Sequence, residues 1–126
     1  MLSIRIFNPE LPYNTALANY KKAVEADPSN FDAQFNLGVY QFNKAAEMYN
    51  KTTKMDYATY QKQGQKMEDQ AKAMFQQAIP YFEAALKLDP TDRASMKSLS
   101  QIYLKLGRNA DAERMNKMMD ESAKKK

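Results

Sequence analysis

Two stretches of this sequence carry the same pattern: PSNFDAQFNLGVYQF at residues 28–42 and PTDRASMKSLSQIYL at residues 90–104. In both stretches an aspartate precedes the proline, and a leucine, Leu37 or Leu99, follows it by nine positions. The residues leading up to each proline also match, since the first is preceded by KKAVEAD and the second by EAALKLD. The chain therefore contains two copies of one unit.

The composition is that of a helical chain. Only 3 Gly and 5 Pro occur in 126 residues, whereas residues that lose little freedom in a helix recur throughout. The length and the apolar fraction of 44% suit one domain with a modest core. We predict helices at about 13–26, 31–52, 57–88, 93–106 and 109–123, with Gly107 ending the fourth in the left-handed conformation.

The absence of histidine and cysteine excludes several classes of functional site. Without His or Cys the chain has no disulfide, no cysteine nucleophile, no histidine base and none of the usual zinc sites. Adjacent carboxylates diverge around a helix, and the glycines are isolated, so we predict no catalytic, cofactor-binding or metal residue, and no enzyme. The absence of cysteine fits either a reducing or an oxidising compartment, so the sequence does not indicate which one holds the protein.

The charge and hydropathy argue against two classes of partner. The net charge of +4 owes three units to Lys124, Lys125 and Lys126, which leaves the body of the chain almost neutral. Scattered arginines among acidic residues make no basic track, so nucleic acid is not an expected partner. No apolar run is long enough for membrane insertion, and the chain as given is expected to be soluble.

The repeated unit resembles the tetratricopeptide pattern, in which a large residue, Leu-Gly and Tyr mark a first helix and Ala, an aromatic, Ala and Pro mark a second. Gln34, Gln41, Ser100 and Asn116 depart from the pattern. The matching positions that we expect to hold the repeats together are Ala16, Tyr20, Ala23, Pro28, Leu37, Gly38, Ala78, Phe82, Ala85, Pro90, Leu99, Tyr103 and Ala112.

The resemblance implies an all-α superhelix of about 2.5 repeats. We expect a single domain over 1–126. Its parts are a non-repeat segment at 1–12, a half repeat at 13–28, an enlarged repeat at 31–90, a last repeat at 93–120 and a basic tail at 121–126. The enlarged repeat is similar to bacterial repeat proteins of unassigned role that are often exported when full length. The cytoplasm fits the chain as given, and the periplasm fits a fragment of an exported protein.

The middle repeat is enlarged, because 62 residues separate Pro28 from Pro90 and the usual period is about 34 residues. Shared equally, the excess of about 28 residues would lengthen each helix by roughly 21 Å. We predict a long antiparallel hairpin that turns within residues 51–56, with Asp56 as a cap. Its seam is predicted at Phe35, Gly38, Phe42, Ala45, Tyr49 and Thr52, and at Tyr57, Tyr60, Gly64, Met67, Ala71, Met74 and Ala78.

Two irregularities are expected in this hairpin. The second helix is longer than the first, so either an overhang or a break near Gly64 must absorb the difference. Pro80 lies inside the second helix, where it removes a backbone hydrogen bond, and we predict a kink between Gln76 and Pro80.

The first repeat lacks its first helix, which leaves the apolar stripe of Leu17, Tyr20 and Val24 to be covered. The N-terminal apolar residues could fold back over it, or a second protomer could pack there. We favour the second protomer, which predicts a homodimer.

The resemblance implies a concave inner face built from first-helix positions. These positions are Asp32, Phe35, Val39, Phe42 and Asn43 in the middle repeat, and Ala94, Lys97, Gln101, Leu104 and Lys105 in the last. An apolar and basic surface of this kind suits a short peptide with acidic groups. Alternatively, Phe35 and Phe42 simply pack the hairpin.

Two functions follow from these expectations. The first is a protein-interaction scaffold that binds an unidentified protein or peptide through the concave face, the hairpin or both. The second is a structural module that assembles through its hairpins or its unpaired first helix. The methionines, at helical spacing, are interpreted as core filler, although an adaptable recognition surface is the other interpretation.

Overall fold

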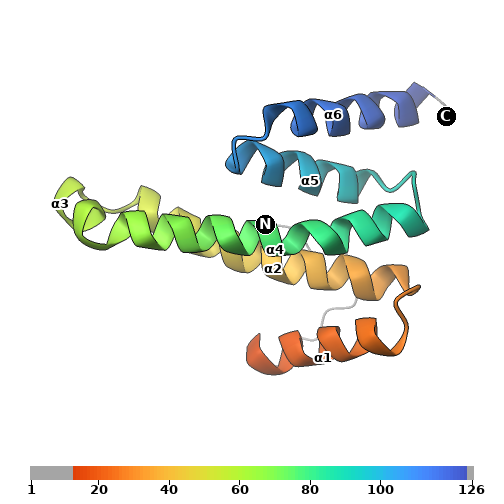
Figure 1. Cartoon of the computed structure of the whole chain (residues 1–126), viewed down its shortest axis with the longest axis horizontal. Helices are drawn as coiled ribbons and strands as arrows, with labels where there is room; N and C mark the ends of the chain where they lie inside the picture. Colours follow the sequence, from red (N-terminus) through yellow and green to blue (C-terminus); the bar gives the residue numbers. More distant parts are fainter. Residues whose placement is uncertain (1–12, 125–126) are drawn as a thin grey trace.

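The computed structural model describes residues 13–124, and all regular elements in this range are helices (Figure 1). They are α1 (Tyr13–Ala26), α2 (Phe31–Thr53), α3 (Tyr57–Thr59), the π-helical segment η1 (Tyr60–Gly64), α4 (Gln65–Leu88), α5 (Arg93–Lys105) and α6 (Asn109–Lys124). The helices stack side by side, and the pair of α2 and α4 extends past the ends of its neighbours (Figure 1). The all-α fold with one long hairpin is confirmed, and the predicted helix ends lie within one residue of those observed.

The two junctions between repeats are built alike, as the matching sequences predict. Ser29 and Thr91 each donate from their backbone N–H and from their hydroxyl to the carboxylate two residues earlier, on Asp27 and Asp89. The next residue, Asn30 or Asp92, then caps the following helix by accepting a hydrogen bond from the third residue beyond it. The same local chemistry therefore starts both first helices.

The seam of the hairpin is aromatic at its base and lined by alanines further out. The rings of Phe35 and Phe82 meet edge to face at 5.8 Å between centroids, and those of Phe42 and Phe75 at 5.5 Å. Gly38 allows the closest approach, because a Cβ at this position would lie only 3.0 Å from the Phe82 ring. Besides the phenylalanine rings, Ala45, Ala71 and Ala78 of the seam are fully buried, with Ala45 and Ala71 on the side toward the tip of the hairpin.

The greater length of the second arm is absorbed by an overhang together with the π-helical turn. Asp56 caps the new helix as predicted, by accepting a hydrogen bond of 2.7 Å from the backbone N–H of Thr59. A Cβ on Gly64 would lie 3.1 Å from the sulfur of Met55, so the turn after α2 already lies beside Gly64. Residues 57–63 consequently project beyond the end of α2.

This overhang corrects the predicted seam. Tyr57 was expected to face the first arm, but its side chain is 77% exposed because α2 has ended before it. Further along, Phe75 is fully buried while the predicted seam residue Met74 is only half-buried. Gly64, Ala71 and Ala78 are buried as predicted, so the seam keeps its phase there, and the step after Ala71 is four residues, to Phe75, rather than three, to Met74.

Pro80 lies inside α4, which continues through it to Leu88. Its side chain and that of Gln76 are exposed, so solvent can reach the carbonyl group that loses its backbone donor. The proline thus sits on the one side of the helix where its cost is smallest. The kink itself stays a prediction.

The last repeat closes the stack with polar as well as apolar contacts. Ser100 donates to the side-chain carbonyl oxygen of Asn116 at 2.9 Å, and Tyr103 donates to Glu83 at 3.2 Å. Burial, with Glu83 beside it, raises the pKa of Tyr103. Gly107 has a φ of 75° and ends α5 in the left-handed conformation, as predicted. The exposed residues on α6 are mainly charged, among them Glu113, Arg114, Lys117, Asp120 and Glu121.

The first described helix, α1, packs against α2 through Tyr20 and Tyr40, whose ring centroids lie 6.2 Å apart. Leu17, Tyr20 and Val24 are half-buried, and burial raises the pKa of Tyr20. The predictions for the segment 1–12, and for the last two lysines of the basic tail, lie outside the described residues. The homodimer stays a prediction.

Candidate interaction groove

The predicted concave face divides into a buried half and an exposed half. On α2, Phe35, Val39 and Phe42 are all buried, and Phe35 and Phe42 make the edge-to-face contacts of the hairpin seam. On α5, by contrast, Lys97 and Lys105 are exposed. The alternative interpretation, in which the two phenylalanines pack the hairpin, therefore describes their contacts.

The remaining predicted positions of the concave face are half-buried, partly buried or exposed. Asp32, Asn43 and Gln101 are half-buried, and Ala94 packs partly buried against the core. Leu104 is 57% exposed, which is unusual for a leucine in a helix that otherwise buries its apolar residues. Exposed apolar area on a structured helix is one mark of an interaction surface.

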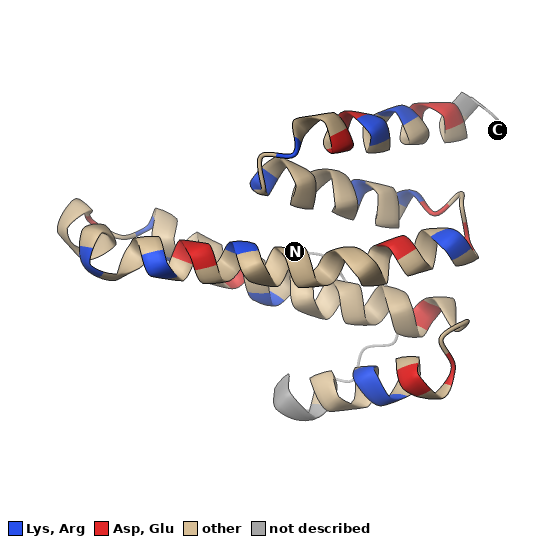
Figure 2. Ribbon diagram, in the orientation of Figure 1, with Lys and Arg blue, Asp and Glu red and all other residues tan. Residues whose placement is uncertain are grey.

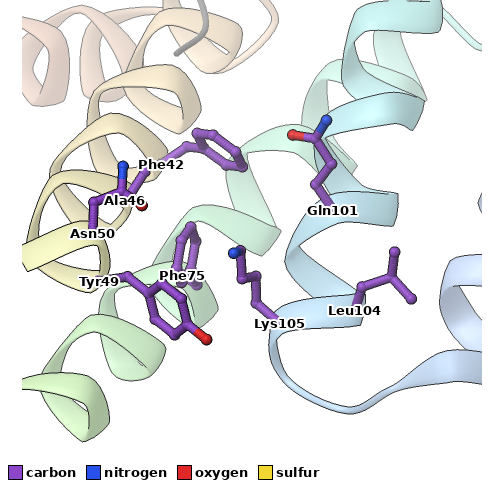
Figure 3. A pocket seen from close by; sticks show the side chains of 8 residues that line it. All are labelled: Phe42, Ala46, Tyr49, Asn50, Phe75, Gln101, Leu104 and Lys105. Atoms are coloured by element: carbon purple, nitrogen blue, oxygen red, sulfur yellow. The ribbon is translucent and has the colours of Figure 1, made fainter. Parts of the chain in front are cut away.

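A groove of about 580 Å³ lies where the hairpin leaves the helical stack (Figure 3). It is formed by residues of α2 on one side, by α4 at its base and by α5 on the other side. The lining residues are Phe42, Ala46, Tyr49, Asn50, Phe75, Gln101, Leu104 and Lys105. Four of the predicted concave-face residues therefore meet in one groove.

The base of the groove is apolar because the phenylalanine pair of the seam, Phe42 with Phe75, lies beneath it. Ala46 provides only a methyl group, which leaves room above the two rings. The amide side chains of Asn50 and Gln101 lie on opposite walls, one on each helix. The groove thus combines an apolar base with polar groups at its sides, as small ligand and peptide sites do.

Lys105 gives the groove a positive charge. Its ammonium group lies 4.3 Å from the centroid of the Tyr49 ring, and the lysine reaches from α5 toward the hairpin (Figure 3). Among residues 13–124, no carboxylate lies within ion-pair distance of this ammonium group. None of the lining residues is acidic either. The positive charge is therefore available to an anionic group.

The enlargement of the middle repeat creates one wall of this groove. A regular first helix of this repeat would end near Lys44, so Ala46, Tyr49 and Asn50 belong to the inserted part of α2. Sequence reasoning placed Phe42, Gln101, Leu104 and Lys105 at the site but missed Ala46, Asn50 and Phe75, and it assigned Tyr49 to the seam. The spacing of residues 42, 46, 49 and 50, on one face of a helix, was the signal that could have found the wall.

Charges elsewhere are mixed. Figure 2 shows Lys and Arg next to Asp and Glu along most helices, while the inner parts of α2 and α4 carry few charges. In the range 13–124, no cluster of acidic residues could hold a metal ion. No helix that the structure describes is both long enough and apolar enough to cross a membrane.

Comparison with known proteins identifies the family. A family model described as a TPR repeat matches residues 13–44, and a second, described as a tetratricopeptide repeat, matches residues 69–125. No curated protein matches the chain. The two family matches leave out residues 45–68, which are the outer part of the hairpin. Together with the stacked helical hairpins, they show that this chain belongs to the tetratricopeptide repeat family.

Proposed function

We propose that this protein is a scaffold that holds a partner protein in the groove between the hairpin and α5. Tetratricopeptide repeats generally mediate protein–protein interactions, and they are typically scaffolds without catalytic activity. The observation that carries the proposal is the groove itself, since it joins an apolar base, an exposed leucine and an ammonium group that no carboxylate of residues 13–124 approaches within ion-pair distance.

The proposed site is narrower than the concave face expected from the sequence. It retains Phe42, Gln101, Leu104 and Lys105, together with Lys97 two turns earlier on the exposed side of α5. It leaves out Phe35 and Val39, because both are buried within the core cluster and could reach a partner only if α2 moved. It gains Ala46, Tyr49, Asn50 and Phe75 from the hairpin.

The proposal is tested by capturing partners from the source cell with the full chain. We expect Lys97→Glu with Lys105→Glu, or Leu104→Asp alone, to lose the captured protein. Matched controls are Lys87→Glu with Lys117→Glu, two exposed lysines on other surfaces, and Leu88→Asp, a leucine that is 40% exposed at the end of α4. Equal loss of the partner from the control variants, or retention by all variants, would contradict the proposal.

The second function, assembly of the chain with itself, has one observation in its favour, namely the exposed ring of Tyr57 at the hairpin tip. Light scattering of the same variants distinguishes the two. If the scaffold proposal holds, the mass in solution is unchanged in Lys97→Glu with Lys105→Glu. If the chain assembles through the hairpin tip, Tyr57→Ala with Tyr60→Ala lowers the mass, and the groove variants do not.

A further inference from the structure

We propose that the outer end of the hairpin, residues 51–66, docks on the surface of an anionic lipid bilayer. The inference goes beyond the proposed function, because none of these residues lines the groove between α2 and α5. It concerns attachment at the level of the lipid headgroups, with the helical stack held away from them.

The positive charge of the described chain is concentrated at this tip. Residues 51–66 contain four lysines and one aspartate, which give a net charge of +3. The other described residues, 13–50 and 67–124, contain twelve Lys or Arg and thirteen Asp or Glu, which give a net charge of −1. Figure 2 shows Lys recurring around the outer end of the hairpin. The tip is therefore the part of this range that an anionic surface attracts most strongly.

The lysines of the tip are exposed and keep their charge available. They are Lys51 in the last turn of α2, Lys54 at its cap, Lys62 in η1 and Lys66 in the first turn of α4. Within residues 13–124, none of the four lies within ion-pair distance of a carboxylate. The single acidic residue of the tip, Asp56, already accepts the hydrogen bond from Thr59 that caps α3.

The nearest other carboxylates lie behind the tip, toward the helical stack. Glu47 precedes Lys51 by one turn of α2, whereas Glu68 and Asp69 follow the tip on α4. Glu68 is also paired with Lys72, at 3.7 Å. A surface that meets the hairpin end-on consequently meets the lysines before these acidic residues.

Tyr57 gives the tip an aromatic group at its outer end. Its side chain is 77% exposed, and α3, which it begins, lies at the far end of the hairpin (Figure 1). A tyrosine combines an apolar ring with a polar hydroxyl, and such side chains are enriched where headgroups meet acyl chains. Because α2 and α4 extend past the ends of their neighbours, a flat surface can reach Tyr57 without touching α1, α5 or α6 (Figure 1).

The kind of basic residue favours a bilayer over an acidic protein or a nucleic acid. All basic residues of the tip are lysines, whereas the arginines of the described chain, Arg93, Arg108 and Arg114, lie in the last repeat. Lysine is a flexible point charge and is depleted at protein interfaces, where the fixed fork of arginine is preferred. Lysine clusters are attracted to anionic lipids that have no fixed positions. A nucleic acid would be expected to follow a longer basic track.

Sedimentation of the full chain with lipid vesicles tests the inference. We expect binding to vesicles that mix phosphatidylcholine with phosphatidylglycerol, and none to phosphatidylcholine alone. Changing the four lysines of the tip to glutamine should weaken binding at least about tenfold. The matched control changes four exposed lysines elsewhere to glutamine and should bind as the wild type does; these are Lys21, Lys22, Lys87 and Lys117.

Fluorescence locates the contact, because the chain contains no tryptophan. In Tyr57→Trp, the emission should shift to shorter wavelength when the mixed vesicles are added, and high salt should reverse the shift. Leu88→Trp is the matched control, since this leucine is 40% exposed but lies at the opposite end of α4, and its emission should not shift.

Five outcomes would overturn the inference. Equal binding to phosphatidylcholine vesicles, or equal loss in the lysine control, would show that the charge of the tip is not read. Loss of binding in Lys124→Gln with Lys125→Gln and Lys126→Gln, but not in the tip variant, would make the basic tail the anchor. A shift of the Tyr57→Trp emission that grows with protein concentration alone would make a second copy the occupant. An equal shift with single-stranded DNA or with inorganic phosphate would assign the tip to those anions. Absence of any binding to the mixed vesicles would also reject it.

Discussion

The middle and last repeats solve the same packing problem in different ways. In the middle repeat, Gly38 lets the Phe82 ring lie directly against the backbone of α2. At the corresponding positions of the last repeat, Ser100 and Asn116 join their side chains by a hydrogen bond of 2.9 Å. Both departures from the tetratricopeptide pattern therefore form one replacement, in which a polar pair substitutes for a glycine and an aromatic ring.

The two contacts differ in how much they contribute to the stability of the protein. The Phe82 ring is buried and also touches Phe35, so it belongs to the shared core of the long hairpin. Asn116, although bonded to Ser100, is exposed to solvent on α6. A hydrogen bond of this kind contributes about 1 kcal/mol, whereas a buried phenylalanine contributes several times more. The hairpin base should therefore tolerate much less change than the end of the stack.

The largest expected effect is the loss of the Phe82 ring. Phe82→Ala should lower the free energy of unfolding by about 3–5 kcal/mol, because it leaves a cavity between Gly38 and Phe35. Asn116→Ala should lower it by about 1 kcal/mol, because it removes one hydrogen bond made by an exposed side chain. Urea denaturation followed by circular dichroism measures both. Equal costs for the two substitutions would remove the proposed contrast between the repeats.

The second-largest effect is expected at Gly38 and Ser100, the residues that contact Phe82 and Asn116. Gly38→Ala should cost about 1–2 kcal/mol, because its Cβ, 3.0 Å from a ring that is packed on all sides, outweighs the better helix propensity of alanine. Ser100→Ala should cost less than about 1 kcal/mol. The same urea denaturation applies. Adding Phe82→Leu to Gly38→Ala should recover part of the loss, and a further loss would show that crowding is not the cause.

The smallest expected effect comes from the different ways in which the turns of the middle and last hairpins are stabilised. Gly107 closes the last hairpin through the backbone alone, whereas Asp56 caps the middle one with a carboxylate. Hydrogen bonds from Thr59 lower the pKa of Asp56 below its ordinary value of 3.8. Since the folded value is the lower one, the cap stabilises fully above about pH 3.8. This stabilisation is lost as pH falls through the lowered value.

Thermal unfolding from pH 7 to pH 2 checks this dependence. The advantage of the wild type over Asp56→Ala should be present at pH 7 and should vanish at the acid end of the range. Asp56→Asn is the matched control, because an asparagine caps a helix without titrating and should keep its advantage over Asp56→Ala throughout. A pH dependence shared by the asparagine variant would assign the effect to other carboxylates.

Much of the fold could be predicted from the sequence, because its signals are local. Asn30, Asp56 and Asp92 start helices through their own side chains, and Gly107 ends one through its own backbone. The spacing of Pro28 and Pro90 revealed the enlarged hairpin, since each repeat carries the same punctuation. Helix ends were accordingly correct to within one residue.

The candidate site could be predicted only in part, because it depends on how helices pack. The position of Tyr57 was wrong, since helical spacing alone does not reveal where the partner helix ends. Phe35 and Val39 were placed on an open face by resemblance, but packing within the hairpin buries them. Tyr49 was placed in the seam by its spacing of three and four residues, and in the structure it packs against the core and also lines the groove. The length mismatch of the two arms predicted an overhang or a break near Gly64 as alternatives, and the structure has an overhang together with a π-helical turn that ends at Gly64.

The overhang at residues 57–63 has a consequence for how the hairpin opens. This end of the helix is held by the Asp56 cap, by the hydrogen bond of the Tyr60 hydroxyl to Glu68 and by that of Gln61 to Tyr57, without a packed face of α2. Behind it, the contacts between the two arms are made by alanines first and by the larger, paired phenylalanine rings nearer the base. Local unfolding should therefore begin at the tip and require more free energy with each turn, so that amide protons exchange in order along the arm.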